Sequence, residues 1–179
     1  YQYGIERAFP VSVQTAAELA PREVAPADLA GRLDLRGKTV ITIDGASSKD
    51  FDDAVSLERD ARGRWVLGVH IADVSHYVAE GSPLDLEAWN RGTSVYFADQ
   101  VVPMLPPELS NGICSLNPHV DRLALSCILT MGPDGAVLDH RLVKSVIRST
   151  ERMTYGDCNT LLAGLDPEPV SYTHLTLPT

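Results

Sequence analysis

The segment VITIDGASSKDFDDAVSL, residues 40–57, places an acidic loop between two short apolar runs. The first run is Val40–Ile43 and leads into Asp44, whereas the second run, Ala54–Leu57, begins directly after Asp53. Both runs contain β-branched residues and are short, which is typical of strands. The pattern predicts two strands that hold both ends of the loop at the edge of a sheet.

The loop and its ends carry four aspartates, Asp44, Asp50, Asp52 and Asp53, whereas 24 acidic residues in 179 give about 1.3 in an average stretch of ten. Two unit charges about 4 Å apart repel by about 1 kcal/mol in water and about 4 kcal/mol at an effective dielectric constant of 20. Clustered carboxylates therefore stay splayed in solvent, take up protons or hold cations. A solvated acidic loop and a metal site both fit the pattern, and the flanking strands favour the metal site.

The side chains of the acidic segment indicate which kind of metal it could bind. An EF-hand calcium loop is excluded, because a loop that starts at Asp50 has Ala54 and Val55 where a ligand and a glycine are required. The segment offers several oxygen ligands and contains no His or Cys. Such a donor set suits Mg²⁺ or Mn²⁺, and sites of this kind commonly hold a phosphate.

Composition limits the class of protein. A chain of 179 residues with 44% hydrophobic residues can build one core, and it contains no apolar run of 18 residues and no charged-then-apolar leader. We therefore expect a cytoplasmic protein that does not enter a membrane. Cys114, Cys127 and Cys158 form no Cys-x-x-Cys pair, which fits reduced thiols.

The net charge of −9 argues against a broad basic surface for nucleic acid. It does not exclude nucleic acid, because bound divalent ions invert the sign of an acidic site and another domain can carry the basic groove. The charge therefore favours a fragment over a complete nucleic-acid enzyme.

Prolines and glycines divide the chain. Residues 1–10 are interpreted as the end of a preceding β-rich module, and residues 11–36 as a linker with a short helix around Thr15–Ala20 that Pro21 stops. Residues 37–165 form the main domain. Residues 166–179 form a tail, in which 171–179 match no periodic element and are interpreted as a non-native cloning or sequencing scar.

Turn and capping signals locate the other elements. A hairpin is expected around residues 59–64, a helix from the Ser82-Pro83 cap to about Arg91, and a strand over 94–97. The proline-rich stretch 103–118 reads as a fixed loop. A central strand over 122–131 is apolar on both faces and turns at 132–135 into a partner strand, and a capping box at Thr154 starts a helix that ends at Gly164.

Four blocks in order, residues 42–55, 68–78, 91–97 and 103–123, resemble the catalytic (RNB) domain of the ribonuclease II / ribonuclease R family, on its ribonuclease R side. The resemblance covers about residues 35–162, and residues 1–10 are similar to the end of a cold-shock-type barrel. It implies an α+β fold with a mixed, largely antiparallel sheet and flanking helices, of which this chain holds the N-terminal portion.

The resemblance also implies an activity, namely processive 3′→5′ hydrolysis of single-stranded RNA to nucleoside 5′-monophosphates with Mg²⁺, or Mn²⁺ in its place, by a two-metal mechanism. On that basis Asp44 and Asp53 are metal ligands, Asp50 ligates or orients at the second position, and Asp52 orients the attacking water. Tyr96 matches an aromatic that stacks on the terminal base, and Tyr155 matches a second tyrosine that contacts RNA. For both tyrosines a core role remains the alternative.

The family's domain continues well beyond this chain and supplies an arginine at the cleavage site, much of the RNA channel and a following S1-type barrel. We therefore expect a monomeric fragment that is weakly active or inactive alone and has no DNA preference. Two alternatives remain open, a non-catalytic RNA-binding or scaffolding piece and a different two-metal phosphohydrolase. His70 and His76 are expected to be structural, and Asn111, Asn117 and Arg122 to fix their loop rather than contact RNA.

Overall fold

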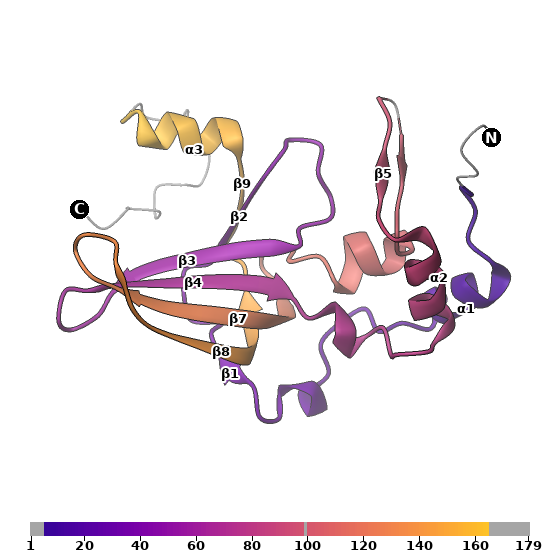
Figure 1. Cartoon of the computed structure of the whole chain (residues 1–179), viewed down its shortest axis with the longest axis horizontal. Helices are drawn as coiled ribbons and strands as arrows, with labels where there is room; N and C mark the ends of the chain where they lie inside the picture. The colour runs from indigo at the N-terminus through magenta and orange to yellow at the C-terminus, as the bar shows by residue number, and fades with distance from the viewer. Residues whose placement is uncertain (1–5, 99, 165–179) are drawn as a thin grey trace.

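The computed structural model describes residues 6–98 and 100–164. Within this range a seven-stranded sheet runs across the molecule, and a two-stranded ribbon rises beside it (Figure 1). The strands of the sheet are β1 (Leu33–Asp34), β2 (Ile41–Asp44), β3 (Asp53–Arg59), β4 (Trp65–Ala72), β7 (Asp121–Met131), β8 (Val137–Arg148) and β9 (Glu151–Thr154). The ribbon consists of β5 (Val95–Tyr96) and β6 (Val101–Val102).

The sheet is mixed, with antiparallel pairs in the middle and a parallel pair at each end. Its order is β1-β8-β7-β4-β3-β2-β9. The pairs from β8 across to β2 are antiparallel, whereas β1 runs parallel to β8 and β9 runs parallel to β2. The expected α+β fold with a largely antiparallel sheet is confirmed, and β7 lies inside the sheet, between β8 and β4, as its two apolar faces predicted.

Hairpin turns explain why neighbouring strands pair. Between β3 and β4, the Asp60 carboxylate accepts bonds from the backbone amides of Arg62 and Arg64, each at 2.9 Å, while Gly63 adopts a φ of 74°. A second turn, at residues 132–135, joins β7 to β8. Both turns lie where the sequence predicted them.

The helices begin and end where their caps dictate. Helix α2 (Pro83–Arg91) starts behind Ser82, whose hydroxyl accepts the amide of Asp85 at 3.2 Å, and ends at Gly92 with a φ of 71°. Helix α3 (Tyr155–Leu162) starts with the predicted capping box at Thr154. Helix α1 (Val11–Glu18) begins and ends a few residues earlier than the predicted helix.

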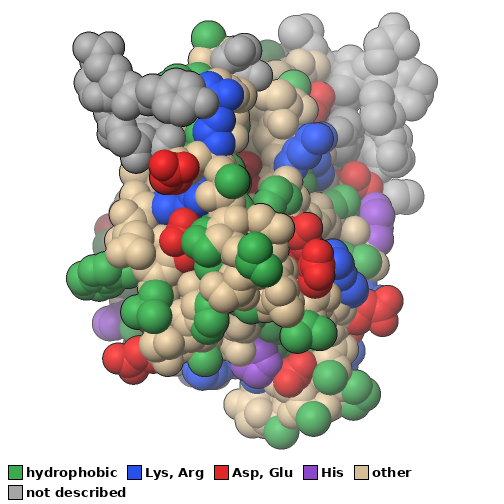
Figure 2. Space-filling model, turned by 90° about the vertical axis from the view of Figure 1, so that its right-hand side faces the viewer, with side chains coloured by type: hydrophobic (Ala, Val, Ile, Leu, Met, Phe, Trp, Pro, Cys, Tyr) green, Lys and Arg blue, Asp and Glu red, His purple; other side chains and the backbone are tan. Residues whose placement is uncertain are grey.

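Two buried clusters stabilise the molecule. The first packs small residues of one sheet face, including Ala54 and Ala124, against Val40, Phe51 and Leu116, which lie outside the strands. The second joins α1, α2 and the turn at Leu109–Ile113, with Val13, Leu84 and Leu109 among its members. That end of the molecule exposes apolar side chains interspersed with charged ones (Figure 2).

Several features of the fold were not expected from the sequence. Within the stretch interpreted as a linker, a short helix was predicted, but the burial of Val13 and Ala17 by α1, the 3₁₀ turn over Pro26–Leu29 and the pairing of β1 with β8 were not. Strand β9 was missed, as were the π-type turn within the loop 103–118 and a 3₁₀ turn at Val74–His76.

The expectations for both ends of the chain lie partly or wholly outside the described residues. The residues interpreted as the end of a barrel are described only from Glu6 onward, and the tail interpreted as a scar, residues 171–179, is not described. The boundaries proposed for the domains stay predictions. In the described part of the chain, no helix is long and apolar enough to cross a membrane.

Candidate functional site: an aspartate loop at one end of the sheet

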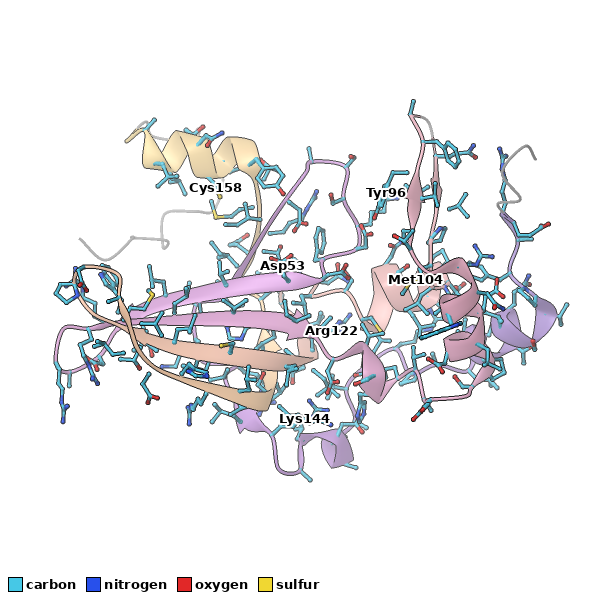
Figure 3. The ribbon with its side chains drawn as sticks, in the orientation of Figure 1. Asp53, Tyr96, Met104, Arg122, Lys144 and Cys158 are labelled. Atoms are coloured by element: carbon cyan, nitrogen blue, oxygen red, sulfur yellow. The ribbon has the colours of Figure 1, made fainter. Side chains whose placement is uncertain are left out.

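The four predicted aspartates lie at one end of the sheet. Asp44 ends β2 and Asp53 begins β3, its antiparallel neighbour, so the loop that carries Asp50 and Asp52 joins two paired strands. The end of β3 that holds Asp53 faces the side of the molecule on which Tyr96 lies (Figure 3). The strand order thus concentrates the acidic groups at a single place.

Ser115 fixes the middle of the loop from outside it. Its hydroxyl accepts the amide of Phe51 at 3.0 Å and donates to the carbonyl of Lys49 at 2.9 Å. The next residue, Leu116, donates its amide to the carbonyl of Phe51 at 2.8 Å. Because the Phe51 side chain is buried in the first core cluster, the aspartates on either side of it are held on a rigid turn.

Arg152, on β9, holds the start of the loop. Its guanidinium donates to the carbonyls of Ala46 at 2.6 Å and Gly45 at 3.2 Å, and it lies 5.2 Å from the centre of the Phe51 ring. The strand pairing makes this contact possible, because Thr42 of β2 is in register with Arg152. The positive charge of Arg152 also lowers the pKa of the Asp44 carboxyl, but burial and the neighbouring aspartates raise that pKa by more.

The carboxylates interact electrostatically as a group. Burial raises the pKa of Asp44, and the charges of Asp53 and Asp50 raise it further. Burial likewise raises the pKa of Asp52, followed by the charges of Asp50, Asp53 and Asp44. The neighbouring aspartates therefore repel the charges of Asp44 and Asp52, which is the condition under which a cation or a proton is favoured.

The donor set fits a hard divalent cation in one specific respect. The Oδ2 atom of Asp44 is buried and has no hydrogen-bond partner in the described structure, although a buried carboxylate oxygen is costly to leave unpaired. A cation bound to that oxygen would compensate for its burial. Among the described residues, however, no three Asp, Glu, His or Cys side chains are grouped closely enough to hold a metal ion as they stand. The described side chains therefore form no coordination shell as they stand, and the assignment of the four aspartates as metal ligands stays a prediction.

Tyr96 is brought to the loop by the β5–β6 ribbon. Its hydroxyl donates to Oδ2 of Asp50 at 3.0 Å, and this hydrogen bond raises the pKa of the phenol. The side chain is 65% exposed, so Tyr96 is not a core residue, and its ring is open to solvent. One residue thus combines an oriented polar tip with an accessible aromatic surface.

Tyr155 is also exposed, at 63%, at the first position of α3. It directly follows Thr154, which is in register with Asp44 on the neighbouring strand. The parallel pairing of β2 with β9 therefore places Tyr155 at the aspartate end of the sheet, whereas the β5–β6 ribbon brings Tyr96 there.

The sequence did not indicate the supporting residues Ser115 and Arg152. Ser115 lies in a stretch without periodicity, and Arg152 lies in a short strand that was not predicted. Only the pairing of β9 with β2 and the return of residues 113–116 toward the loop reveal their roles.

The residues expected to be structural make structural contacts. His70 is fully buried between the hydroxyls of Ser56 at 3.0 Å and Ser126 at 2.7 Å, and burial lowers its pKa to about 4. Arg122 is buried and donates to the carbonyl of Ser115 at 2.8 Å, and so it braces the residue that holds the loop.

The remaining residues of that group also serve the local structure. Asn117 donates to the carbonyl of Asn111 at 3.1 Å, which closes the loop on itself. His76 lies 3.1 Å from a carboxylate oxygen of Asp28, beside Arg32. None of these contacts involves one of the four aspartates.

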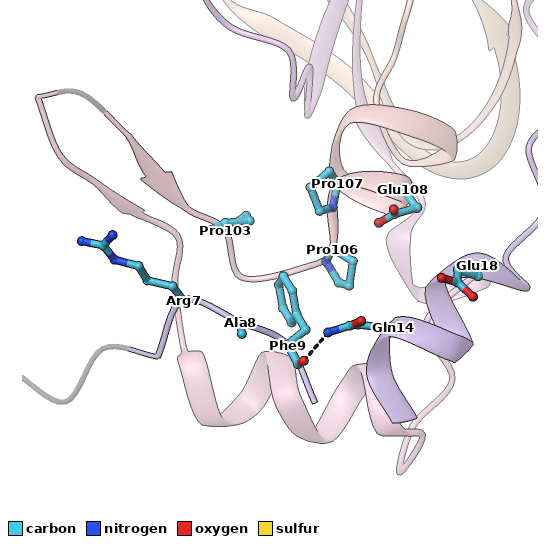
Figure 4. A pocket seen from close by; sticks show the side chains of 9 residues that line it. All are labelled: Arg7, Ala8, Phe9, Gln14, Glu18, Pro103, Pro106, Pro107 and Glu108. Carbon is cyan, nitrogen blue, oxygen red and sulfur yellow. Dashed lines mark hydrogen bonds between the residues drawn. The ribbon is translucent and has the colours of Figure 1, made fainter. Parts of the chain in front are cut away.

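A separate hollow of about 340 Å³ lies between the N-terminal segment, α1 and the proline-rich turn (Figure 4). Its walls include Phe9, Pro106 and Glu108, and the amide of Gln14 donates to the carbonyl of Phe9 at 2.6 Å. The aspartates do not line it, so it is distinct from the candidate site.

Comparison with known proteins identifies relatives over most of the chain. The model of the RNB domain family matches residues 32–175. Ribonuclease R 1 of Lactococcus lactis is 54% identical over 156 residues, which is 87% of this chain and 19% of that protein. The chain spans about a fifth to a quarter of the length of the curated relatives that it matches.

Solved structures share the fold. Mycoplasma genitalium RNase R, in a complex with double-stranded RNA, aligns with a TM-score of 0.86 and 32% identity over 94% of this chain and 30% of that one. Yeast Ssd1, described as a pseudonuclease, aligns with a TM-score of 0.74 at 20% identity over 84% of this chain and 19% of that one. The second likeness concerns the fold alone.

Proposed function

Because the chain belongs to the RNB domain family, we propose that it supplies the acidic part of the active site of a ribonuclease R-type exoribonuclease. The observation that carries this proposal is the aspartate loop, in which four electrostatically coupled carboxylates are held by Ser115 and Arg152 beside an exposed tyrosine. An acidic loop that is merely solvated would not need hydrogen bonds from two distant segments of the chain to hold it in place.

Asp44, Asp50, Asp52 and Asp53 would hold Mg²⁺, or Mn²⁺ in its place. Divalent ions bound there would polarise the phosphodiester and lower the pKa of a water nucleophile, as in two-metal phosphodiesterases. The partnerless oxygen of Asp44 supports its assignment as a ligand. The carboxylates whose pKa values burial raises, Asp44 and Asp52, would release their protons more readily once a cation compensates the repulsion.

Tyr96 would act at the boundary between the metal site and the substrate. Its hydroxyl orients Asp50, and its exposed ring offers a face on which a base can stack regardless of sequence. Tyr155 would provide a second contact on the other side of Asp44. Stacking of this kind suits single-stranded RNA, which we propose as the substrate.

The proposals on direction, products, location and oligomeric state concern a protein of the length of the curated relatives. We propose processive 3′→5′ hydrolysis to nucleoside 5′-monophosphates, in the cytoplasm, by a monomer without DNA preference. Related structures are complexes of Mycoplasma genitalium RNase R with double-stranded RNA and with ribose-methylated single-stranded RNA. With a net charge of −9, this stretch alone would bind RNA weakly, so most of the phosphate contacts would come from elsewhere. We therefore expect the stretch alone to be weakly active or inactive.

The experiment that tests this proposal uses a hybrid enzyme, in which the part of this chain that aligns over 156 residues with Lactococcus lactis ribonuclease R 1 replaces the matching stretch of that protein. The hybrid should shorten a 5′-labelled single-stranded RNA from its 3′ end with Mg²⁺ and stop when a chelator is added. An Asp52→Asn hybrid should bind the RNA but not cleave it, whereas an Asp139→Asn hybrid, changed at an exposed aspartate on β8, should cleave normally. Cleavage that survives Asp52→Asn would contradict the proposal.

A second candidate is a non-catalytic RNA-binding module. One observation favours it, namely that no three side chains in the described range form a metal-holding group as they stand. On this reading the hybrid would bind RNA with equal affinity whether Mg²⁺ or a chelator is present, and it would leave the RNA intact.

A further inference from the structure

Arg152 lies on the same side of the sheet as Asp44. Because β9 runs parallel to β2 with Arg152 in register with Thr42, these two side chains point to one face of the sheet. Side chains alternate along a strand, so Asp44, two residues after Thr42, points to that face as well. Burial is the main cause that raises the pKa of Asp44, and the charge of Arg152 opposes that rise. A guanidinium is therefore part of the acidic site.

The guanidinium of Arg152 is fixed in place without being paired to a carboxylate. Its Nη2 atom donates to the carbonyls of Ala46 at 2.6 Å and Gly45 at 3.2 Å, and the centre of the Phe51 ring lies 5.2 Å away. In the part of the chain that the structure describes, Arg152 makes no ion pair, although the four aspartates lie in or beside the same loop. Its positive charge is therefore held at the site and is not neutralised by an acidic partner.

Part of the hydrogen-bonding capacity of Arg152 is unused. A guanidinium carries five N–H donors on three nitrogens, and within the described residues only Nη2 of Arg152 makes hydrogen bonds. The Nε atom is buried, which leaves Nη1 as the free donor of a side chain that is only partly buried. Arg122 also lacks a carboxylate partner, but it is 7% exposed and donates to two carbonyls through Nε and Nη1. A ligand can therefore reach Arg152, whereas Arg122 is enclosed.

A phosphate oxygen is the partner that fits this free donor. Guanidinium groups pair most strongly with carboxylates and phosphates, whose oxygens match the planar arrangement of the N–H donors. The bonds to the two carbonyls fix the orientation of Arg152 and keep it out of ion pairs with the aspartates of the loop. An anchor for two carbonyls does not need to be charged, because a neutral amide also donates hydrogen bonds. The retained charge therefore points to an anionic ligand.

We infer that Arg152 is a substrate-binding residue that contacts a phosphate of single-stranded RNA at the aspartate loop. The inference rests on the proposed function and adds to it a cation that this stretch itself supplies. A phosphate that approaches several carboxylates is repelled, and a fixed guanidinium beside them reduces that repulsion. Tyr155, the second proposed RNA contact, lies three residues further along the chain, which is about 10 Å in an extended strand.

The salt dependence of RNA binding distinguishes a phosphate contact from a purely structural anchor. Each phosphate of a single strand that a basic side chain neutralises adds about 0.7 to the slope of log affinity against log salt concentration. A side chain that only holds the loop leaves this slope unchanged. The measurement uses the hybrid with Lactococcus lactis ribonuclease R 1 in an Asp52→Asn background, which is expected to bind RNA without cleaving it. Filter binding at several KCl concentrations and constant Mg²⁺ gives the slope.

Three substitutions in that background test the contact. Arg152→Gln should weaken RNA binding about tenfold at about 100 mM KCl and lower the slope by about 0.7. Arg152→Lys keeps the positive charge and should keep the slope. Arg141→Gln removes an exposed arginine of β8 that makes no ion pair within the described residues, and it should change neither affinity nor slope. A parental slope in Arg152→Gln would overturn the inference, and so would an equal loss of slope in Arg152→Lys.

Loosening of the loop needs its own control, because Arg152→Gln also removes the bonds to Ala46 and Gly45. Ser115→Ala loosens the same loop from another side and leaves the charge of the site unchanged. Its slope should equal that of the parent. A drop as large as that in Arg152→Gln would overturn the inference, since the slope would then follow the order of the loop. RNA cleavage by the hybrid without Asp52→Asn tests the proposed function separately, so the two failures can be told apart.

Discussion

Replacing Ser115 with alanine tests whether the aspartate loop is held from outside. The substitution removes the acceptor for the Phe51 amide at 3.0 Å and the donor to the Lys49 carbonyl at 2.9 Å. Ser115 is completely buried and Phe51 is 4% exposed, so water has poor access to the groups left behind. A buried backbone group that loses its partner costs about 1–3 kcal/mol, and we expect a loss of about 2 kcal/mol in the free energy of unfolding.

The matched control is Ser110→Ala. Ser110 lies in the same turn and also donates its hydroxyl to backbone carbonyls, at 3.3 and 3.4 Å, but it makes no bond to the aspartate loop. Urea denaturation should show the loss for Ser115→Ala and a much smaller change for Ser110→Ala. For a chain of this size the melting temperature should fall by about 4–8 °C. Equal stabilities of the two variants would refute the assignment of Ser115 as the anchor of the loop.

Three further predictions follow from the described contacts. Gly68→Ala should lower the free energy of unfolding by about 1–3 kcal/mol in urea denaturation, because its Cβ would clash with Oγ of Ser56 and lie 2.7 Å from Nε2 of His70. Stability equal to that of the parent would contradict this packing. The stability that His70 contributes should be complete above its unfolded pKa of 6.5. About 3 kcal/mol of it should be lost as the pH falls toward the folded pKa of about 4, because only the unfolded state takes up the proton in that window. A His70→Gln variant with the same dependence of stability on pH would disprove this. In the hybrid enzyme, Tyr96→Ala should weaken RNA binding by about 1–3 kcal/mol in a filter-binding assay, whereas Tyr96→Phe, which keeps the ring, should retain most of the affinity, and an equal loss in both would exclude stacking.

Local patterns were sufficient to predict much of the fold. The cap formed by Ser82 and Gly92 sets both ends of α2, and the turns at Asp60 and Gly135 set the two hairpins. In each of these cases the structural cause lies within a few residues in the sequence. The two apolar faces of 122–131 likewise predicted a strand with a neighbour on each side.

Features that depend on distant segments could not be predicted in this way. Strand β9 has four residues and exists because it pairs with β2, about 110 residues earlier in the chain. Helix α1 was expected within a linker, but its burial depends on α2 and on the turn at Leu109. Short elements of this kind have weak propensities of their own and are stabilised by tertiary contacts.

In the candidate site, too, the features set by nearby residues could be predicted and those set by distant segments could not. The four aspartates are close in sequence, so their clustering was visible as a local excess of charge. Ser115 and Arg152 were not found, because each reaches the loop from a segment more than 60 residues away, as the separations of 64 and 106 residues in their bonds indicate. The contact between Tyr96 and Asp50 likewise depends on where the β5–β6 ribbon is placed.

Binding of Mn²⁺ to the purified chain, followed by electron paramagnetic resonance of the free ion, tests the central claim most directly. The chain should bind Mn²⁺, Asp44→Asn should weaken the binding at least about tenfold, and Mg²⁺ should compete for the same site. The control Asp139→Asn removes the same charge from an exposed position on β8 and should leave the affinity unchanged. Equal affinities of the two variants, or no binding by a folded chain, would contradict the assignment of the aspartate loop as a metal site.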